Sequence, residues 1–200
     1  MAENIIAVPV QNPPAVFTQE EIGWTPWIEP LSEGELTERH YAGLVEEARA
    51  KSAYFRLLVR DPEVLEARTK LDKDVFYNTR TGLPRVEREL AATAASRFNG
   101  CIYCASVHSR LAAHHSRRKQ DVQRLLDDGS EADLGERWNA LVAASVALTA
   151  TPPVFDNSHV ERLSAAGLDE LEIADVIHGA AFFNWANRLM LSLGEPTPAQ

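Results

Sequence analysis

The two cysteines of this chain lie close together in the sequence. Cys101 and Cys104 are the only cysteines among 200 residues, and His108 follows four residues after the second. Residues three and four apart share one face of a helix, so these three side chains would line a single stripe. A Cys-x-x-Cys pair can close into a disulfide, and a helix start or a nearby imidazolium favours thiolate. The segment is therefore a candidate for thiol redox chemistry.

Glu89 is a candidate carboxylate partner for this stripe. It lies twelve residues before Cys101, on a preceding predicted helix. If Asn99 and Gly100 join two antiparallel helices, Glu89 comes beside His108. The set then holds two thiols, an imidazole and a carboxylate, which are groups that can activate a thiol and protonate a leaving group.

Three other interpretations use the same segment. A c-type haem site requires a histidine directly after the second cysteine, where this chain has Ala105, so that interpretation fails. A structural zinc site needs about four ligands. The cysteine pair and its histidine supply three, and the fourth would come from Glu89, His114 or His115. In the third interpretation both cysteines are simply small buried side chains.

The elements that must position these residues are predicted to be helices. Apolar residues recur at 3.6-residue spacing, and neither strand alternation nor a fixed-period repeat is evident. Pro62 after Asp61, and Glu172 three residues after Asp169, are typical of helix starts. Asn157 or Ser158 is expected to cap another helix. We therefore expect an all-α fold, with helices over 33–48, 54–59, 62–75, 84–97, 101–116, 120–126, 133–149, 158–166 and 170–193.

Residues 1–32 differ from the rest in composition. They contain five prolines and the aromatic residues Phe17, Trp24 and Trp27. Proline disfavours helix, whereas the aromatic residues argue against a fully solvated tail. We expect an extended proline-rich arm that packs on the body or on a neighbouring subunit, followed by one helical domain over 33–200.

Composition excludes several classes of partner. Asp plus Glu is 29 and Lys plus Arg is 20, so the net charge is −9. This charge disfavours binding to nucleic acid or to anionic membranes. The longest apolar stretch, 140–150, is well short of the roughly 20 residues that a spanning helix needs. With no basic leader, the sequence indicates a soluble, cytoplasmic protein.

The segments 83–90 and 99–104, together with His108, resemble the alkylhydroperoxidase D-like group of the carboxymuconolactone decarboxylase superfamily. The shared pattern is a Glu, a gap of eleven residues, Cys-x-x-Cys, three residues and a His. Residues 168–177 and 182–189 are similar to the closing helix of that superfamily. The resemblance is nearest to its peroxidase-related members and implies an alkylhydroperoxidase D-like helical fold.

The resemblance also implies roles for the four candidate residues. In that family the second cysteine attacks the peroxide, the first resolves it, and Glu and His form a proton relay. These roles fall on Cys104, Cys101, Glu89 and His108. The chain departs from the pattern at Tyr103, where well-studied members have a further histidine. Members that decarboxylate a lactone lack the cysteine pair, so peroxide reduction is the favoured activity.

The sequence therefore predicts a thiol-dependent peroxidase or disulfide oxidoreductase. It would act on a small hydroperoxide, take electrons from a protein or lipoyl thiol, and need no cofactor or metal. The alternatives are a non-enzymatic redox sensor and a zinc-stabilised helical oligomer. The apolar stretches 140–150 and 182–185 favour a homo-oligomer, which the resemblance makes a trimer or hexamer. His178, on the last predicted helix, is expected to be a core residue or to face the cysteine pocket.

Overall fold

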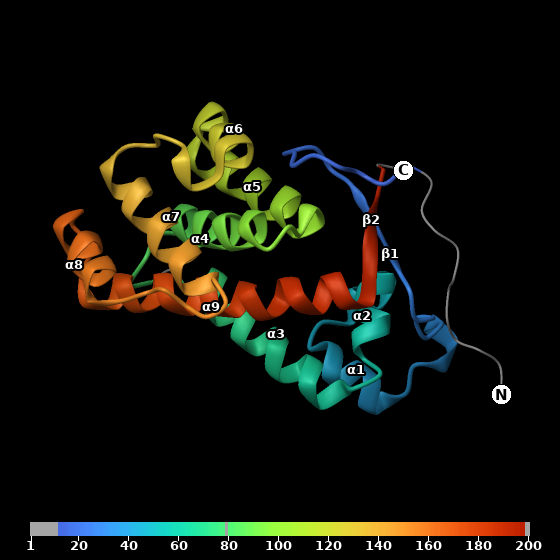
Figure 1. The fold of residues 1–200 in the computed structure, drawn as a ribbon. Helices are drawn as coiled ribbons and strands as arrows, with labels where there is room; N and C mark the ends of the chain where they lie inside the picture. Colours follow the sequence, from blue (N-terminus) through green and yellow to red (C-terminus); the bar gives the residue numbers. More distant parts are fainter. Residues whose placement is uncertain (1–11, 79, 199–200) are drawn as a thin grey trace.

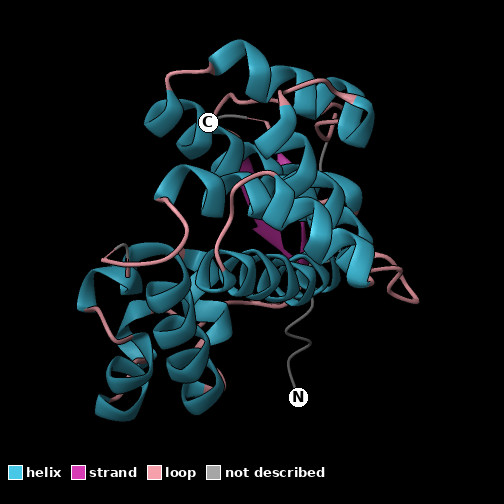
Figure 2. Ribbon diagram, turned by 90° about the vertical axis from the view of Figure 1, so that its left-hand side faces the viewer, coloured by secondary structure: helices cyan, strands magenta, loops and turns pink. Residues whose placement is uncertain are grey.

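The computed structural model describes residues 12–78 and 80–198, and this part of the chain is mainly helical (Figures 1 and 2). The expected all-α class is confirmed, with short 3-10 turns at Glu33–Glu35, Glu47–Lys51 and Gly129–Glu131. The α-helices are α1 (Glu38–Leu44), α2 (Ala53–Leu58), α3 (Pro62–Tyr77), α4 (Arg85–Phe98), α5 (Ile102–Ser116), α6 (Lys119–Asp128), α7 (Glu136–Thr149), α8 (Asn157–Ala165) and α9 (Glu170–Leu193).

Side-chain caps fix the two helix starts that the sequence marks most clearly. The carboxylate of Asp61 accepts a hydrogen bond from the backbone N–H of Val64, and Pro62 occupies the first position of α3. At α9, Asp169 accepts from the N–H of Glu172 at 2.8 Å, and Glu172 accepts from the N–H of Asp169 at 3.0 Å. Both aspartate side chains thus accept hydrogen bonds from backbone N–H groups that have no partner within the first helical turn.

Some predicted helix boundaries are wrong, among them the start of the helix predicted from residue 133, which begins at Glu136 after Gly135. The cap of α8 is Asp156, not Asn157 or Ser158, because its carboxylate accepts from the N–H of Ser158 at 3.0 Å. The segment 33–48 is not one helix: α1 ends at Leu44, and the next residue, Val45, has a φ of 66° in the left-handed region. Periodicity continues through this residue, but its backbone conformation stops the helix.

The expectation of no strand is also wrong at one place. Strands β1 (Gly23–Pro26) and β2 (Gly194–Thr197) pair antiparallel, with Trp24 opposite Pro196. Residues 23–26 of the N-terminal arm therefore lie on the C-terminal end of their own chain (Figure 1), while Gln19 of the arm contacts Lys119 and Gln123 of α6. Gly194 permits this approach, since a Cβ there would lie 2.3 Å from the Trp24 ring. The first eleven residues of the expected arm lie outside the described residues.

Helix α4 lies at the centre of the body and packs against α5, α7 and α9. Every residue from 87 to 96 is buried, and alanines at 91, 92, 94 and 95 allow the neighbouring helices to approach closely. One core cluster surrounds Leu90 and Leu141, and a second surrounds both cysteines with Phe76 and Phe183. None of the helices in the two described stretches combines the length and apolarity needed to cross a membrane.

Candidate active site

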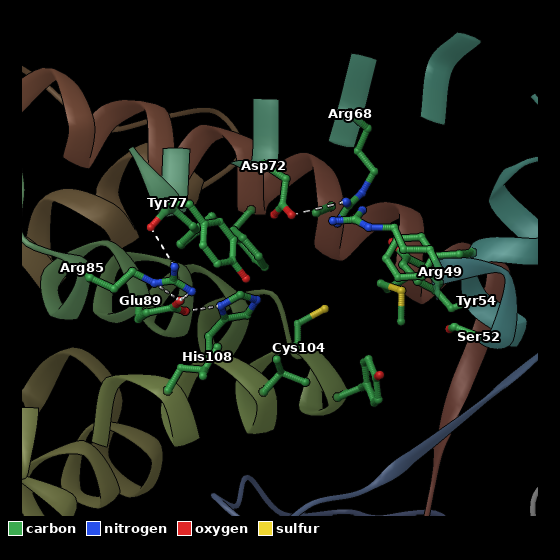
Figure 3. A pocket seen from close by; sticks show the side chains of 18 residues that line it. Arg49, Ser52, Tyr54, Arg68, Asp72, Tyr77, Arg85, Glu89, Cys104 and His108 are labelled. Atoms are coloured by element: carbon green, nitrogen blue, oxygen red, sulfur yellow. Dashed lines mark hydrogen bonds and ion pairs between the residues drawn. The ribbon is translucent and has the colours of Figure 1, made fainter. Parts of the chain in front are cut away.

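A cavity of about 280 Å³ opens beside the second core cluster (Figure 3). Its wall is formed by side chains from α2, α3, α4, α5 and α9 and from the turn before α2. Three of the four predicted site residues, Glu89, Cys104 and His108, line this cavity. Cys101 is not part of the wall and lies in the core cluster with Cys104.

The start of α5 positions both cysteines. Gly100 adopts a φ of 77°, a conformation that glycine reaches without strain, and the N–H of Cys101 then donates to the carbonyl of Ser96 at 2.9 Å. Cys101 is the N-cap residue and Cys104 lies in the first turn of α5. Both are free thiols, 2% and 6% exposed respectively. Tertiary packing thus covers the pair and leaves Cys104 at the cavity.

A hydrogen bond between the two thiols separates their pKa values. The bond from Cys104 lowers the pKa of Cys101, and Asn187 adds a smaller effect in the same direction. The same bond, with burial, raises the pKa of Cys104 well above its usual range. Two interacting groups titrate as a pair. The pair therefore loses its first proton more easily than a free cysteine and its second with much more difficulty.

Glu89 and His108 meet as the predicted helical hairpin requires. Residues 99–101 join α4 to α5, and Nδ1 of His108 lies 2.6 Å from Oε2 of Glu89. The ring of His108 also packs edge-on against Phe183, with the ring centroids 4.1 Å apart. Figure 3 shows the imidazole between the side chains of Glu89 and Cys104. Because Nδ1 is held by the carboxylate, Nε2 is the ring nitrogen left for proton transfer in the cavity.

Arg85 is a part of this site that the sequence analysis missed. Its Nε donates to Oε1 of Glu89 at 2.6 Å, and its Nη1 donates to the carbonyl of Phe76 at 2.8 Å. The guanidinium also lies over the ring of Tyr77, 4.1 Å from its centroid. Glu89 is fully buried, so this cation compensates a charge that would otherwise be costly to bury. An Arg four residues before a Glu on a predicted helix was the available signal.

Known proteins resemble the part of the chain that forms this site. Residues 62–147 match the model of the carboxymuconolactone decarboxylase family, a range that contains all four predicted site residues. Within this range the chain is similar to that family, and the solved structures below extend the likeness at the level of the fold. The resemblance inferred from the sequence is thus confirmed. No curated protein matches the sequence significantly.

Several solved structures are similar to this chain in fold. An uncharacterized peroxidase-related protein from Ralstonia eutropha JMP134, described as an alkylhydroperoxidase AhpD core, is 20% identical with a TM-score of 0.71, covering 85% of this chain and 90% of the other. The debrominase Bmp8 is 18% identical with a TM-score of 0.66, covering 82% and 88%. A putative antioxidant defence protein AhpD from Agrobacterium tumefaciens is 23% identical with a TM-score of 0.59, covering 70% and 94%. At these identities the likeness establishes the fold.

The other histidines of the chain lie away from the cavity. His114 and His115 are exposed in the last turn of α5. The expectation that His178 is core or faces the cysteines is wrong, because it is exposed and lines a separate surface groove with Trp185. In residues 12–78 and 80–198, no three His, Cys, Asp or Glu side chains are grouped to hold a metal. The zinc interpretation therefore finds no ligand set there.

Tyr103 and the α3 side chains complete the cavity wall. Tyr103 occupies the position of the family's additional histidine and lines the cavity, with its pKa raised by burial. It cannot replace an imidazole as a proton carrier near neutral pH. Arg68 and Asp72 also line the cavity from α3, with Nη1 and Oδ2 3.8 Å apart. Their spacing on a predicted helix gave no indication that they face the cysteines.

Proposed function

We propose that this protein is a thiol-dependent peroxidase, or disulfide oxidoreductase, that reduces organic hydroperoxides through Cys101 and Cys104. The observation that carries the proposal is one cavity in which Cys104 meets the Glu89–His108 pair, with a second thiol one turn away. Structural likeness to peroxidase-related proteins supports it. Likeness to a debrominase shows that the same fold serves another reaction, so the activity must be tested directly.

In the first step the thiolate of Cys104 attacks the terminal oxygen of the hydroperoxide. An S–O bond forms, the O–O bond breaks, and the alkoxide leaves with a proton as an alcohol. The cysteine becomes a sulfenic acid, so sulfur is oxidised by two electrons and the peroxide is reduced by two. His108 is the group placed to move the proton, and Glu89 holds its ring in position.

In the second step Cys101 attacks the sulfenic sulfur of Cys104. A disulfide forms and the hydroxyl leaves with a proton as water. A thiolate is the reacting form, and in the reduced pair the hydrogen bond from Cys104 lowers the pKa of Cys101. An external dithiol, from a protein or a lipoyl group, then returns two electrons and two protons to the pair.

The pKa order of the pair also bears on the first step. Cys101 is the more acidic thiol, yet Cys104 is the one that lines the cavity. In the singly deprotonated pair, transfer of the shared proton from Cys104 to Cys101 places the thiolate on the sulfur that a peroxide can reach. We therefore assign the attack to Cys104 by access and the resolving role to Cys101.

A peroxidase assay tests the proposal. The reduced protein is mixed with cumene or t-butyl hydroperoxide, and dihydrolipoamide, thioredoxin and glutathione are compared as electron donors. The proposal predicts turnover with at least one donor and none in Cys104→Ser. Reversible oxidation of the pair without turnover would instead favour the redox-sensor alternative.

A further inference from the structure

Arg68 is a buried cation that uses only part of its hydrogen-bonding capacity. Its side chain is only 10% exposed, and both Nε and Nη1 are buried without a hydrogen-bond partner among the described residues. The nearest carboxylate oxygen, on Asp72, lies 3.8 Å from Nη1, beyond hydrogen-bond length. A buried donor without a partner costs free energy, so this guanidinium is unusual unless something else accepts its hydrogen bonds.

Arg68 lines the cavity that contains Cys104 and also two apolar grooves beside α3, and of these three the cavity is the one that Arg49 lines as well. Figure 3 shows both arginine side chains at the end of the cavity away from Glu89. Arg49 is held by hydrogen bonds from Nη1 to Thr69 at 3.1 Å and from Nε to Glu46 at 3.2 Å. Arginine is the side chain best suited to bind a planar carboxylate.

The charge of the wall favours an anion. Three arginines, including Arg85, and two carboxylates, Asp72 and Glu89, line the cavity, although the whole chain carries a net charge of −9. Arg85 is already paired with Glu89 at 2.6 Å. Arg49 is paired with Glu46 at 3.2 Å, whereas Arg68 has only Asp72 at 3.8 Å, so Arg68 is the least compensated of the three guanidinium groups.

The rest of the wall is mainly apolar. Phe55, Phe76, Leu111, Phe183 and Met190 lie between or beside the charged groups. A volume of about 280 Å³ lies just below the usual range for ligand pockets of about 300–1,000 Å³. Such a space suits a short or medium apolar chain with one charged end.

We propose that Arg68, supported by Arg49, binds the carboxylate of an otherwise apolar hydroperoxide and so directs its peroxide group toward Cys104. That the ligand is a hydroperoxide rests on the proposed function. That it carries a carboxylate rests on the cavity alone. Tyr54 lines the same wall and burial raises its pKa to about 12, so it stays protonated and can donate a further hydrogen bond.

Binding of an inert ligand tests the subsite without any turnover. Calorimetry on the reduced, full-length protein compares octanoate with octanamide, which has the same chain without the charge. We expect octanoate to bind about tenfold tighter or more, as for a charge-assisted hydrogen bond to arginine. Arg68→Met should abolish that preference and Arg68→Lys should keep part of it, while octanamide binding stays unchanged.

Arg110 provides a matched control. It also has a buried nitrogen without a hydrogen-bond partner, but it does not line the cavity, so Arg110→Met should keep the preference for octanoate. Equal binding of octanoate and octanamide by the unmodified protein would overturn the inference, even if every Arg68 variant failed to fold. An unchanged preference in folded Arg68→Met would overturn it as well.

Turnover then tests the substrate class. With dithiothreitol as the reductant, 9-hydroperoxynonanoate is compared with its methyl ester, and the unmodified protein should have about tenfold higher kcat/KM for the acid. Arg68→Met should raise KM for the acid alone. Equal kcat/KM values would overturn the substrate assignment. Preferential octanoate binding with no turnover of any hydroperoxide would keep the subsite and contradict the proposed function.

Discussion

Oε2 of Glu89 lies 2.6 Å from Nδ1 of His108, while Arg85 occupies the other oxygen of the same carboxylate. The carboxylate is completely buried, so both contacts are shielded from water. One oxygen thus fixes the orientation of the imidazole, and the other receives the positive charge that compensates the burial. This arrangement separates the catalytic role that we propose for Glu89 from its structural role.

Glu89→Gln is expected to affect both roles. Removing one partner of a buried ion pair costs roughly 3–5 kcal/mol, which urea unfolding would measure as a loss of stability. Loss of the relay should also slow peroxide reduction by roughly 10²–10⁴-fold at neutral pH. His108→Phe should slow the reaction to a similar extent without breaking the contact between Arg85 and Glu89.

The double variant Arg85→Met/Glu89→Gln separates the two effects. With both charges removed, much of the lost stability should return, because no unpaired guanidinium remains in the core. The reaction should stay slow. Recovery of the rate together with stability would show that Glu89 acts only through folding.

The pKa of Cys101 should depend on the hydrogen bond that it receives from Cys104. Because the bond from Cys104 lowers the pKa of Cys101, thiolate absorbance of the reduced protein should first rise at a lower pH than for free cysteine. Cys104→Ala removes this donor, so the midpoint for Cys101 should move to higher pH. Cys104→Ser retains an O–H donor and should move it less. Equal midpoints in the two variants would exclude the hydrogen bond as the cause.

Gly194→Ala tests the contact between the N-terminal arm and the site. A Cβ at this position would lie 2.3 Å from both the Trp24 ring and the carbonyl oxygen of Thr25. Trp24 packs edge-on against Tyr54 of the cavity wall, with centroids 5.6 Å apart. Overpacking of this kind costs roughly 1–3 kcal/mol, measurable by urea unfolding. Gly34→Ala is the control, because no atom lies within 4 Å of its Cβ position, and it should change stability little.

Self-association remains a prediction, and the structure offers one exposed apolar surface through which two copies of the chain could associate. Val64, Leu71 and Trp185 are 53%, 47% and 42% exposed and line one groove between α3 and α9. Sedimentation equilibrium should give a mass well above 22.2 kDa, and Trp185→Glu should lower it. Phe98→Glu, at the equally exposed end of α4, should leave the mass unchanged. A monomer at micromolar concentration would contradict the prediction.

Local signals made most of the helical framework predictable. The caps at Asp61 and Asp169 and the break at Asn99 and Gly100 follow from side-chain chemistry within a few residues. The same break places Glu89 beside His108, so the contact between them could also be predicted. Arg85 was within reach, because its spacing from Glu89 is itself a helical signal.

The other half of the cavity could not be predicted in this way. Arg49, Tyr54 and Arg68 face the cysteines because α3 and the segment before it pack across α4 and α9, and no sequence spacing encodes that packing. The pairing of β1 with β2 joins segments about 170 residues apart, each only four residues long. Tertiary contacts decide such features, whereas periodicity reports only local structure.

Trapping of the sulfenic acid shows which of the two thiols attacks the peroxide. Reduced Cys101→Ser is treated with one equivalent of cumene hydroperoxide in the presence of dimedone, and the label is located by peptide mass spectrometry. Our account predicts one dimedone adduct on Cys104, formed at a rate that Glu89→Gln and His108→Phe both lower. Adduct formation on Cys101 in the matched Cys104→Ser variant, with Cys104 unlabelled in Cys101→Ser, would contradict it.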